Sequence, residues 1–195
     1  MDLRNKRMND HIVRTFFNCL VNEDFSALTV GQISDAAQIN RSTFYRHFED
    51  KYQLRDHIID SIIQDFVNNL EIRFLDMDIT KDCRVYTSIL KKSLENIFQH
   101  REELEILFRQ KLLGRNVLEE MILAGAEKVK KEILNNDSIS SSKKELADWY
   151  AMLLVNNMLV TTRWWFAHSD RYTPDQVTEM MLQHMTSGTI PTLKS

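Results

Sequence analysis

The feature that most constrains this chain is a series of helix start signals crowded into residues 29–53. Thr29 precedes an apolar pattern and is followed three residues later by Gln32, which is the spacing of a capping box. Asn40 stands where a second helix would begin, and Asp50, with a glutamine three residues on, stands at a third. Three helix starts in so short a stretch predict short helices that are joined by tight turns.

The pattern predicts a helix over 30–37, a three-residue turn, and a second short helix over 41–48. A helix over 4–22 precedes them, and a long helix over 50–75 follows them. A short helix, a tight turn and another short helix are typical of a helix-turn-helix.

The rest of the chain also shows helical periodicity. Only 4 glycines and 2 prolines occur among 195 residues, so few turns interrupt it. The last helix opens with Thr173, Pro174 and Gln176, a cap with a proline in the first turn. We therefore expect an all-α fold. Its further helices are expected over 82–99, 102–112, 115–135, 142–168 and 174–187.

Composition narrows the functional classes. No apolar run approaches the roughly 20 residues that span a bilayer, and the N-terminus lacks the apolar stretch of a secretory signal. Cys19 and Cys83 lie in helical patterns without metal-ligand spacing. No HExxH, GxSxG or P-loop motif is present. We expect a cytoplasmic protein that is not an enzyme, with no metal, no cofactor and no membrane partner.

The second short helix has two distinct faces. Phe44 and Phe48 are four residues apart and are expected to face the core together with Ile39. The outward face is then rich in hydrogen-bond donors, as a surface that reads DNA requires. Its members are Arg41, Ser42, Tyr45, Arg46 and His47.

Within this surface, the first turn of the helix enters a major groove most deeply, so Arg41 and Ser42 are the candidates for base contacts. Hydroxyls of Thr43 and Tyr45 suit phosphate contacts. The remaining phosphate candidates lie at helix starts, where amide groups favour anions. They are Thr29 and Gly31 at the first short helix and Lys51 at the long helix.

The segment ALTVGQISDAAQINRSTFYRHFEDKYQL resembles the DNA-binding domain of the tetracycline-repressor (TetR) family, over roughly residues 8–60. The run S-T-F-Y-R-H-F-x-x-K-x-x-L carries most of this resemblance. It implies a helix-turn-helix domain over 1–50, a helical regulatory and dimerisation domain over 51–195, and a phosphate contact for Tyr45. The pair Trp164-Trp165 resembles a C-terminal subtype of Gram-positive members.

The family's second domain forms a homodimer and often encloses a ligand pocket. Dimer candidates are Trp149, Leu153 and Val160 in one helix and Met181 in the last, although plain core packing also explains their apolar character. Pocket candidates are apolar or polar side chains on helices that are expected to face one another. They are Phe98, Leu107, Phe108, Leu112, Met121, Asn156 and Trp164.

The function that follows is a sequence-specific transcriptional regulator. The resemblance implies a repressor that binds a palindromic double-stranded operator as a homodimer and responds to a small-molecule effector. Two alternatives stay open at this point. One is a co-activator that works through a partner protein, and the other is a helix-turn-helix interaction module that has no DNA binding.

Overall fold

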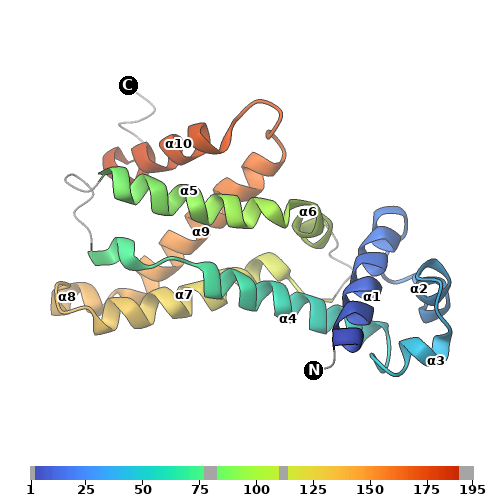
Figure 1. Ribbon diagram of the computed structural model, residues 1–195. Helices are drawn as coiled ribbons and strands as arrows, with labels where there is room; N and C mark the ends of the chain where they lie inside the picture. The colour runs from blue at the N-terminus through green and yellow to red at the C-terminus, as the bar shows by residue number, and fades with distance from the viewer. Residues whose placement is uncertain (1–2, 77–82, 110–113, 189–195) are drawn as a thin grey trace. The chain divides into compact units, whose positions relative to one another are not determined.

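The computed structural model describes residues 3–76, 83–109 and 114–188, and Figure 1 shows their course. Every regular element among them is a helix, which confirms the all-α expectation. In chain order they are α1 (Leu3–Asn22), α2 (Val30–Ala36), α3 (Arg41–Phe44), α4 (Lys51–Asn69), the 3₁₀ turn η1 (Arg73–Asp76), α5 (Cys83–Gln99), α6 (Arg101–Arg109), α7 (Val117–Asn135), α8 (Ser141–Lys144), α9 (Ala147–Phe166) and α10 (Pro174–Ser187).

The chain divides into two compact units. The N-terminal unit comprises residues 1–64 together with 102–117, and the C-terminal unit comprises residues 65–101 together with 118–195. The long helix α4 therefore contributes to both units. The division into domains after residue 50 stays a prediction, since compact units describe packing and not independent folding.

The N-terminal unit has an aromatic and aliphatic core. The apolar stripe of α1 buries Ile12, Phe16 and Leu20, and the ring of Phe16 lies edge-on to Phe25 at 6.0 Å. Helix α1 packs against α2, and α2 packs against α3. Burial of this stripe fixes the two short helices, which would be too short to persist alone.

Two helices end earlier than their patterns predict. Helix α3 stops at Phe44, and Tyr45–His47 continue as turns with three-residue hydrogen bonds such as His47 N to Phe44 O at 2.8 Å. Helix α4 stops at Asn69, well short of residue 75. The ammonium of Lys128 donates to the carbonyls of Val67 and Leu70 at 2.7 and 2.8 Å. Side-chain donors of this kind satisfy the last carbonyls of a helix and so end it.

The expected helix 142–168 is two helices. The break falls at Leu146, whose φ of −102° and ψ of 17° lie outside the helical region. The short α8 precedes it and α9 follows it. Because Ala147 and Ala151 are buried while Leu146 is half exposed, the packing of α9 begins only after this bend.

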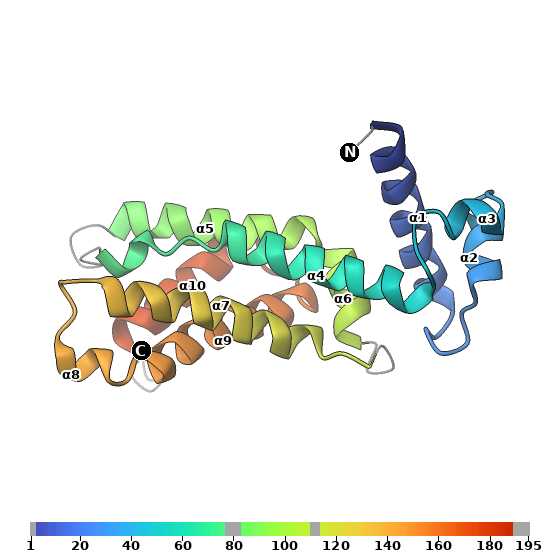
Figure 2. The ribbon, with the colours of Figure 1, turned by 90° about the horizontal axis from the view of Figure 1, so that it is seen from below.

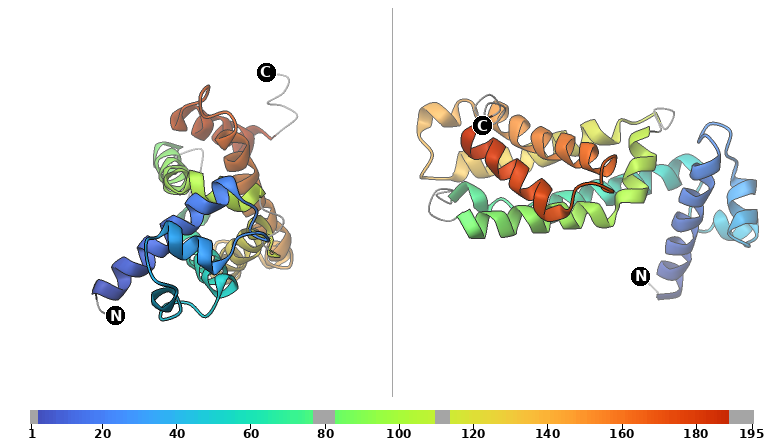
Figure 3. Two further views of the ribbon diagram at one scale, coloured as in Figure 1. Left: turned by 90° about the vertical axis from the view of Figure 1, so that its right-hand side faces the viewer. Right: turned by 90° about the horizontal axis from the view of Figure 1, so that it is seen from above.

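In the C-terminal unit, α5 packs against α9 and α10, as the right-hand view of Figure 3 shows. Helix α7 lies close to the last turns of α4 and to α9 (Figure 2). Gly125 allows this approach, because a Cβ there would lie 2.9 Å from the Phe66 ring and 3.0 Å from Val155 Cγ1. Farther along the core, the rings of Phe98 and Trp165 stack at 4.4 Å.

Candidate nucleic-acid interface

The start of α2 confirms the capping box that the sequence predicts. The amide of Gln32 donates to Thr29 Oγ1 at 3.2 Å, and the amide of Thr29 donates to Gln32 Oε1 at 2.9 Å. Leu28 and Ile33, before and after this box, are both buried at the positions of a hydrophobic staple. The side chain of Gln32 also donates to both carboxylate oxygens of Glu23, which ties the start of α2 to the end of the α1 segment.

The turn between α2 and α3 is a Schellman motif. The amide of Gln38 donates to Asp35 O at 3.1 Å, and the amide of Ile39 donates to Ser34 O at 3.0 Å. Gln38 itself has a φ of 55°, in the left-handed region that usually takes glycine. The tight turn directs the chain from α2 into α3. From the other side, His11 Nε2 donates to the carbonyl of Ala37 at 2.8 Å.

The core-facing side of α3 carries the predicted Phe44 and Phe48, which are both buried. In α2, Ile33, Ser34 and Ala37 are buried, whereas Ala36 is exposed. Ala37 lies three residues after Ser34 and four after Ile33, so these three side chains share one side of the helix.

Asn40 occupies the cap position of α3 as expected, with extended backbone angles. Its side chain makes no capping hydrogen bond, however, so the prediction of a side-chain cap is wrong. The carbonyl of Asn40 accepts hydrogen bonds from the amides of Thr43 and Phe44 at 2.8 and 3.2 Å. The side chain of Asn40 is exposed at the start of α3.

The outward face of α3 and the following turn is exposed. Arg41, Ser42, Tyr45 and Arg46 are exposed, and Tyr45 retains 56% of its accessible surface. Thr43 and His47 are half-buried. The donors that the sequence places on one side of this helix thus share one surface. We call Arg41, Ser42, Tyr45 and Arg46 the α3 face.

Arg41 lies against α2. A Cβ added to Gly31 would meet a guanidinium nitrogen of Arg41 at 2.6 Å. The end of the Arg41 side chain thus lies directly over Gly31. On the same face, Arg46 donates to Thr43 Oγ1 at 3.0 Å, so these two candidates form one hydrogen-bonded pair.

The ammonium of Lys51 makes its hydrogen bonds within the protein, and its phosphate contact stays a prediction. Its ammonium donates to the carbonyls of Phe25, Ser26 and Leu28 at 2.9, 3.1 and 2.6 Å. It also lies 4.8 Å from the centre of the Phe25 ring. Since an ammonium has three donors, this set uses all of them. In this structure Lys51 holds the loop between α1 and α2 in place.

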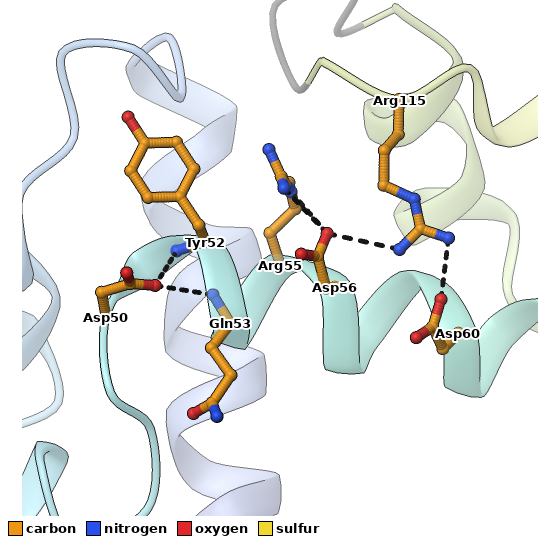
Figure 4. A network of polar contacts seen from close by, with 7 residues as sticks. All are labelled: Asp50, Tyr52, Gln53, Arg55, Asp56, Asp60 and Arg115. Carbon is orange, nitrogen blue, oxygen red and sulfur yellow. Dashed lines mark hydrogen bonds and ion pairs between the residues drawn. The ribbon is translucent and has the colours of Figure 1, made fainter.

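Helix α4 begins with a well-formed cap, shown in Figure 4. Asp50 Oδ1 accepts from the amides of Tyr52 and Gln53 at 2.8 and 2.7 Å. The Gln53 side chain accepts from the amide of Glu49 at 2.7 Å, one residue earlier than the expected box. The cap fixes where α4 starts relative to the α3 turn.

An ionic network on the next turns of α4 involves residues that the sequence did not single out. Arg115, before α7, pairs with Asp56 at 3.3 Å and with Asp60 at 2.7 Å (Figure 4). Arg55 pairs with Asp56 at 2.8 Å. The hydrogen bond from Arg55, supported by one from Arg115, lowers the pKa of Asp56 below its ordinary value. This network joins Arg115 to α4 within the N-terminal unit.

The dimer candidates divide between surface and core. Trp149, Leu153 and Val160 of α9 are 50% to 58% exposed. Met181 is only 4% exposed and belongs to the core, because α10 turns Met180 outward in its place. The exposed residues Trp149, Leu153, Val160 and Trp164 recur at helical spacing along one side of α9. We call these four residues the α9 stripe.

The pocket candidates lie in different surroundings, and their role as a ligand pocket stays a prediction. Phe98 stacks on Trp165, Met121 is buried in α7, and Asn156 and Trp164 are exposed on α9. Leu107 is buried and Phe108 half-buried in α6, and Leu112 lies outside the described residues.

A cavity of the C-terminal unit is lined by other residues, among them Tyr86, Ser93, Asn157, Met158 and Met185. The polar Asn157 on an apolar helix was the available sequence signal. Only the packing of α9 determines that Asn157, and not its neighbour Asn156, lines the cavity.

No group of three or more His, Cys, Asp or Glu side chains suited to a metal ion occurs among the described residues. Within that same part of the chain, every helix is too short or too polar to cross a membrane.

The arrangement of α2, the turn and α3 is a helix-turn-helix, the motif by which many regulators bind DNA. Residues 13–58 match the family model described as bacterial regulatory proteins, tetR family. This match covers the N-terminal region of the chain. The fatty acid degradation regulator FadR from Bacillus halodurans has a similar fold, with a TM-score of 0.59, 12% identity and coverage of 98% of both chains. No curated protein sequence matches the chain. The resemblance of the Trp164-Trp165 pair to a Gram-positive subtype stays a prediction.

Proposed function

We propose that this DNA-binding regulator is a cytoplasmic, non-enzymatic repressor that binds a palindromic operator as a homodimer and responds to a small molecule. The α3 face is the observation that carries the proposal. Arg41, Ser42, Tyr45 and Arg46 are exposed together on a helix whose opposite side is locked into the core by Phe44 and Phe48. Rigid presentation of a donor-rich helix is what reading base edges in the major groove needs.

The α9 stripe supports the homodimer. Four large apolar side chains, two of them tryptophans, are exposed on one side of a single helix. Contiguous apolar surface of this kind is uncommon on a monomer and marks an interaction site. A second copy is the simplest occupant, because a two-fold axis brings the same stripe from each subunit together and spaces two recognition helices for a palindrome.

The first experiment measures binding to a random duplex and to DNA selected from a random pool, over a range of salt concentrations. We expect affinity for both to fall steeply with salt, because lysines and arginines displace counterions from phosphates. Selected DNA is expected to bind more tightly at every concentration. Absence of binding to any duplex at low salt would contradict the proposal.

Replacing Arg41 with alanine is expected to weaken binding to the selected DNA by about 1–3 kcal/mol, because an arginine in the first turn of the recognition helix can pair with guanine through two hydrogen bonds. Binding to random DNA should change much less. Arg14→Ala is the matched control, since Arg14 is an exposed arginine on α1 away from the α3 face. Equal losses on both DNAs would show that Arg41 contacts phosphate and not bases.

A further inference from the structure

A cavity in the C-terminal unit lies between α5, α7, α9 and α10, next to the end of α4. It encloses about 560 Å³, with its open mouth included. Three methionines and six branched aliphatic side chains make up most of the wall. The apolar character of this wall suits a small organic molecule, and methionines adapt easily to its shape.

Four polar residues interrupt the apolar wall. Ser93 Oγ donates to Ile89 O at 3.1 Å, and the hydroxyl of Tyr86 donates to the sulfur of Met185 at 3.0 Å. Burial raises the pKa of Tyr86 to about 12, so its phenol is neutral. Asn157 differs from these, because its amide has no hydrogen-bond partner among the described residues. An amide that lines a cavity without a partner is ready to bond a ligand.

The fourth polar residue is Glu71, the one ionised group among the described residues of the wall. A hydrogen bond from Arg73 lowers the pKa of Glu71, so the carboxylate is charged. Among the residues that the structure describes, no lysine or arginine lines the cavity. The nearby Lys128 donates to the carbonyls of Val67 and Leu70 and does not line it. An anion inside would lose its hydration without gaining a counter-ion, which is strongly unfavourable.

We propose that this cavity binds an uncharged, largely apolar small molecule that carries one hydrogen-bonding group. The amide of Asn157 forms the hydrogen bond with that group. Carboxylates, sulfonates and phosphates are rejected. This names the class of effector for the proposed function. Its effect on DNA rests on that function, whereas binding itself does not.

The location of the cavity explains how occupancy reaches the DNA-binding end of the chain. Leu70 and Glu71 line it and come directly after Asn69, the last residue of α4. Lys128 holds that end through Leu70 O, and its neighbour Val129 lines the cavity. A ligand therefore acts on the end of α4, a continuous helix whose other end follows the α3 turn.

The test uses two fluorescent probes with the same ring system. N-phenyl-1-naphthylamine is neutral and has a single N–H donor, and 8-anilinonaphthalene-1-sulfonate adds a sulfonate. The full-length protein should bind the neutral probe saturably and the sulfonate at least about tenfold more weakly. Equal affinity for both probes, or no saturable binding of the neutral one, would overturn the proposal.

Two variants locate the binding. Val129→Phe, which fills the cavity, should abolish binding of the neutral probe. Asn157→Leu, with similar volume and no hydrogen bond, should weaken it by about tenfold, while Asn135→Leu, on the exposed end of α7, should leave it unchanged. Full binding by Val129→Phe would place the probe elsewhere and overturn the assignment. Unchanged binding of the neutral probe by Asn157→Leu would show that Asn157 does not bond the ligand.

The same samples separate this inference from the proposed function. A protein that binds selected DNA but not the neutral probe refutes the ligand class and leaves the DNA-binding function standing. A protein that binds the neutral probe but no duplex supports the ligand class and refutes the DNA-binding function. When both occur, saturating probe should lower the affinity for selected DNA in the parent protein and not in Val129→Phe.

Discussion

Replacing Lys51 with methionine is expected to destabilise the N-terminal unit by about 2–4 kcal/mol, because hydrogen bonds from a charged donor are strong and their loss leaves carbonyls without a partner. The ammonium of Lys51 holds the carbonyls of Phe25, Ser26 and Leu28 and lies over the Phe25 ring. Methionine keeps the length and apolar stem of the side chain. The loop between α1 and α2 should therefore become more mobile, and the packing of α2 and α3 should weaken with it.

The measurement must resolve the two units. All three tryptophans lie in α9, so their fluorescence follows the C-terminal unit. Hydrogen exchange followed by mass spectrometry reports on α1 to α3 directly. We expect faster exchange across residues 12–48 in Lys51→Met and an unchanged tryptophan signal. Lys6→Met, at an exposed position of α1, removes the same charge and should leave exchange as it was.

The result also decides between two roles for Lys51. If Lys51 contacts phosphate, as its place in the tetR-like motif predicts, Lys51→Met should lower affinity for all DNA with no change in hydrogen exchange. If it anchors the loop, exchange should rise even without DNA. Slow exchange in Lys51→Met, equal to that of the parent protein, would refute the structural role.

Replacing Val160 with glutamate is expected to dissociate the proposed homodimer. Val160 is 51% exposed at the centre of the α9 stripe, and a two-fold axis would bring two such carboxylates into one apolar interface. Burying unpaired charge should raise the dimer dissociation constant by roughly 100-fold or more. A monomer carries one helix-turn-helix and binds one half of the palindrome, whereas a dimer binds both halves at once. Affinity for palindromic DNA should therefore fall by roughly 100-fold or more.

Sedimentation equilibrium gives the oligomeric state, and DNA titration gives the affinity. Leu123→Glu is the matched control, because Leu123 is 54% exposed on α7 and lies outside the α9 stripe. Its dimer and its DNA binding should match the parent protein. A Val160→Glu protein that remains dimeric would exclude the α9 stripe as the interface. A parent protein that is monomeric at all concentrations would exclude the homodimer itself.

The local chemistry of the helix-turn-helix could be predicted from sequence because its signals lie within a few residues of one another. The Thr29–Gln32 box depends on a three-residue spacing, and so does the cap at Thr173. Which side of α3 faces outward follows from the spacing of Phe44 and Phe48. Helical periodicity alone was thus enough to predict both the all-α class and the exposed donors of α3.

The ends of the longer helices could not be predicted in the same way. Helix α4 ends at Asn69 because Lys128, far along the chain, caps its carbonyls. Helices α8 and α9 separate at Leu146 because the packing of α9 begins at Ala147. A periodic apolar pattern continues through both points, so it carries no record of contacts made by distant residues.

The sequence by itself therefore determined the helical class, the helix-turn-helix and the side of α3 that is exposed, since all three depend on neighbouring residues. Tertiary structure alone decided that Lys51 binds three loop carbonyls, that Met181 is core while Val160 is surface, and that Asn157 lines the cavity. Each of these depends on which face of a helix another helix covers. An apolar helix with more than one buried side does not specify that choice in its own sequence.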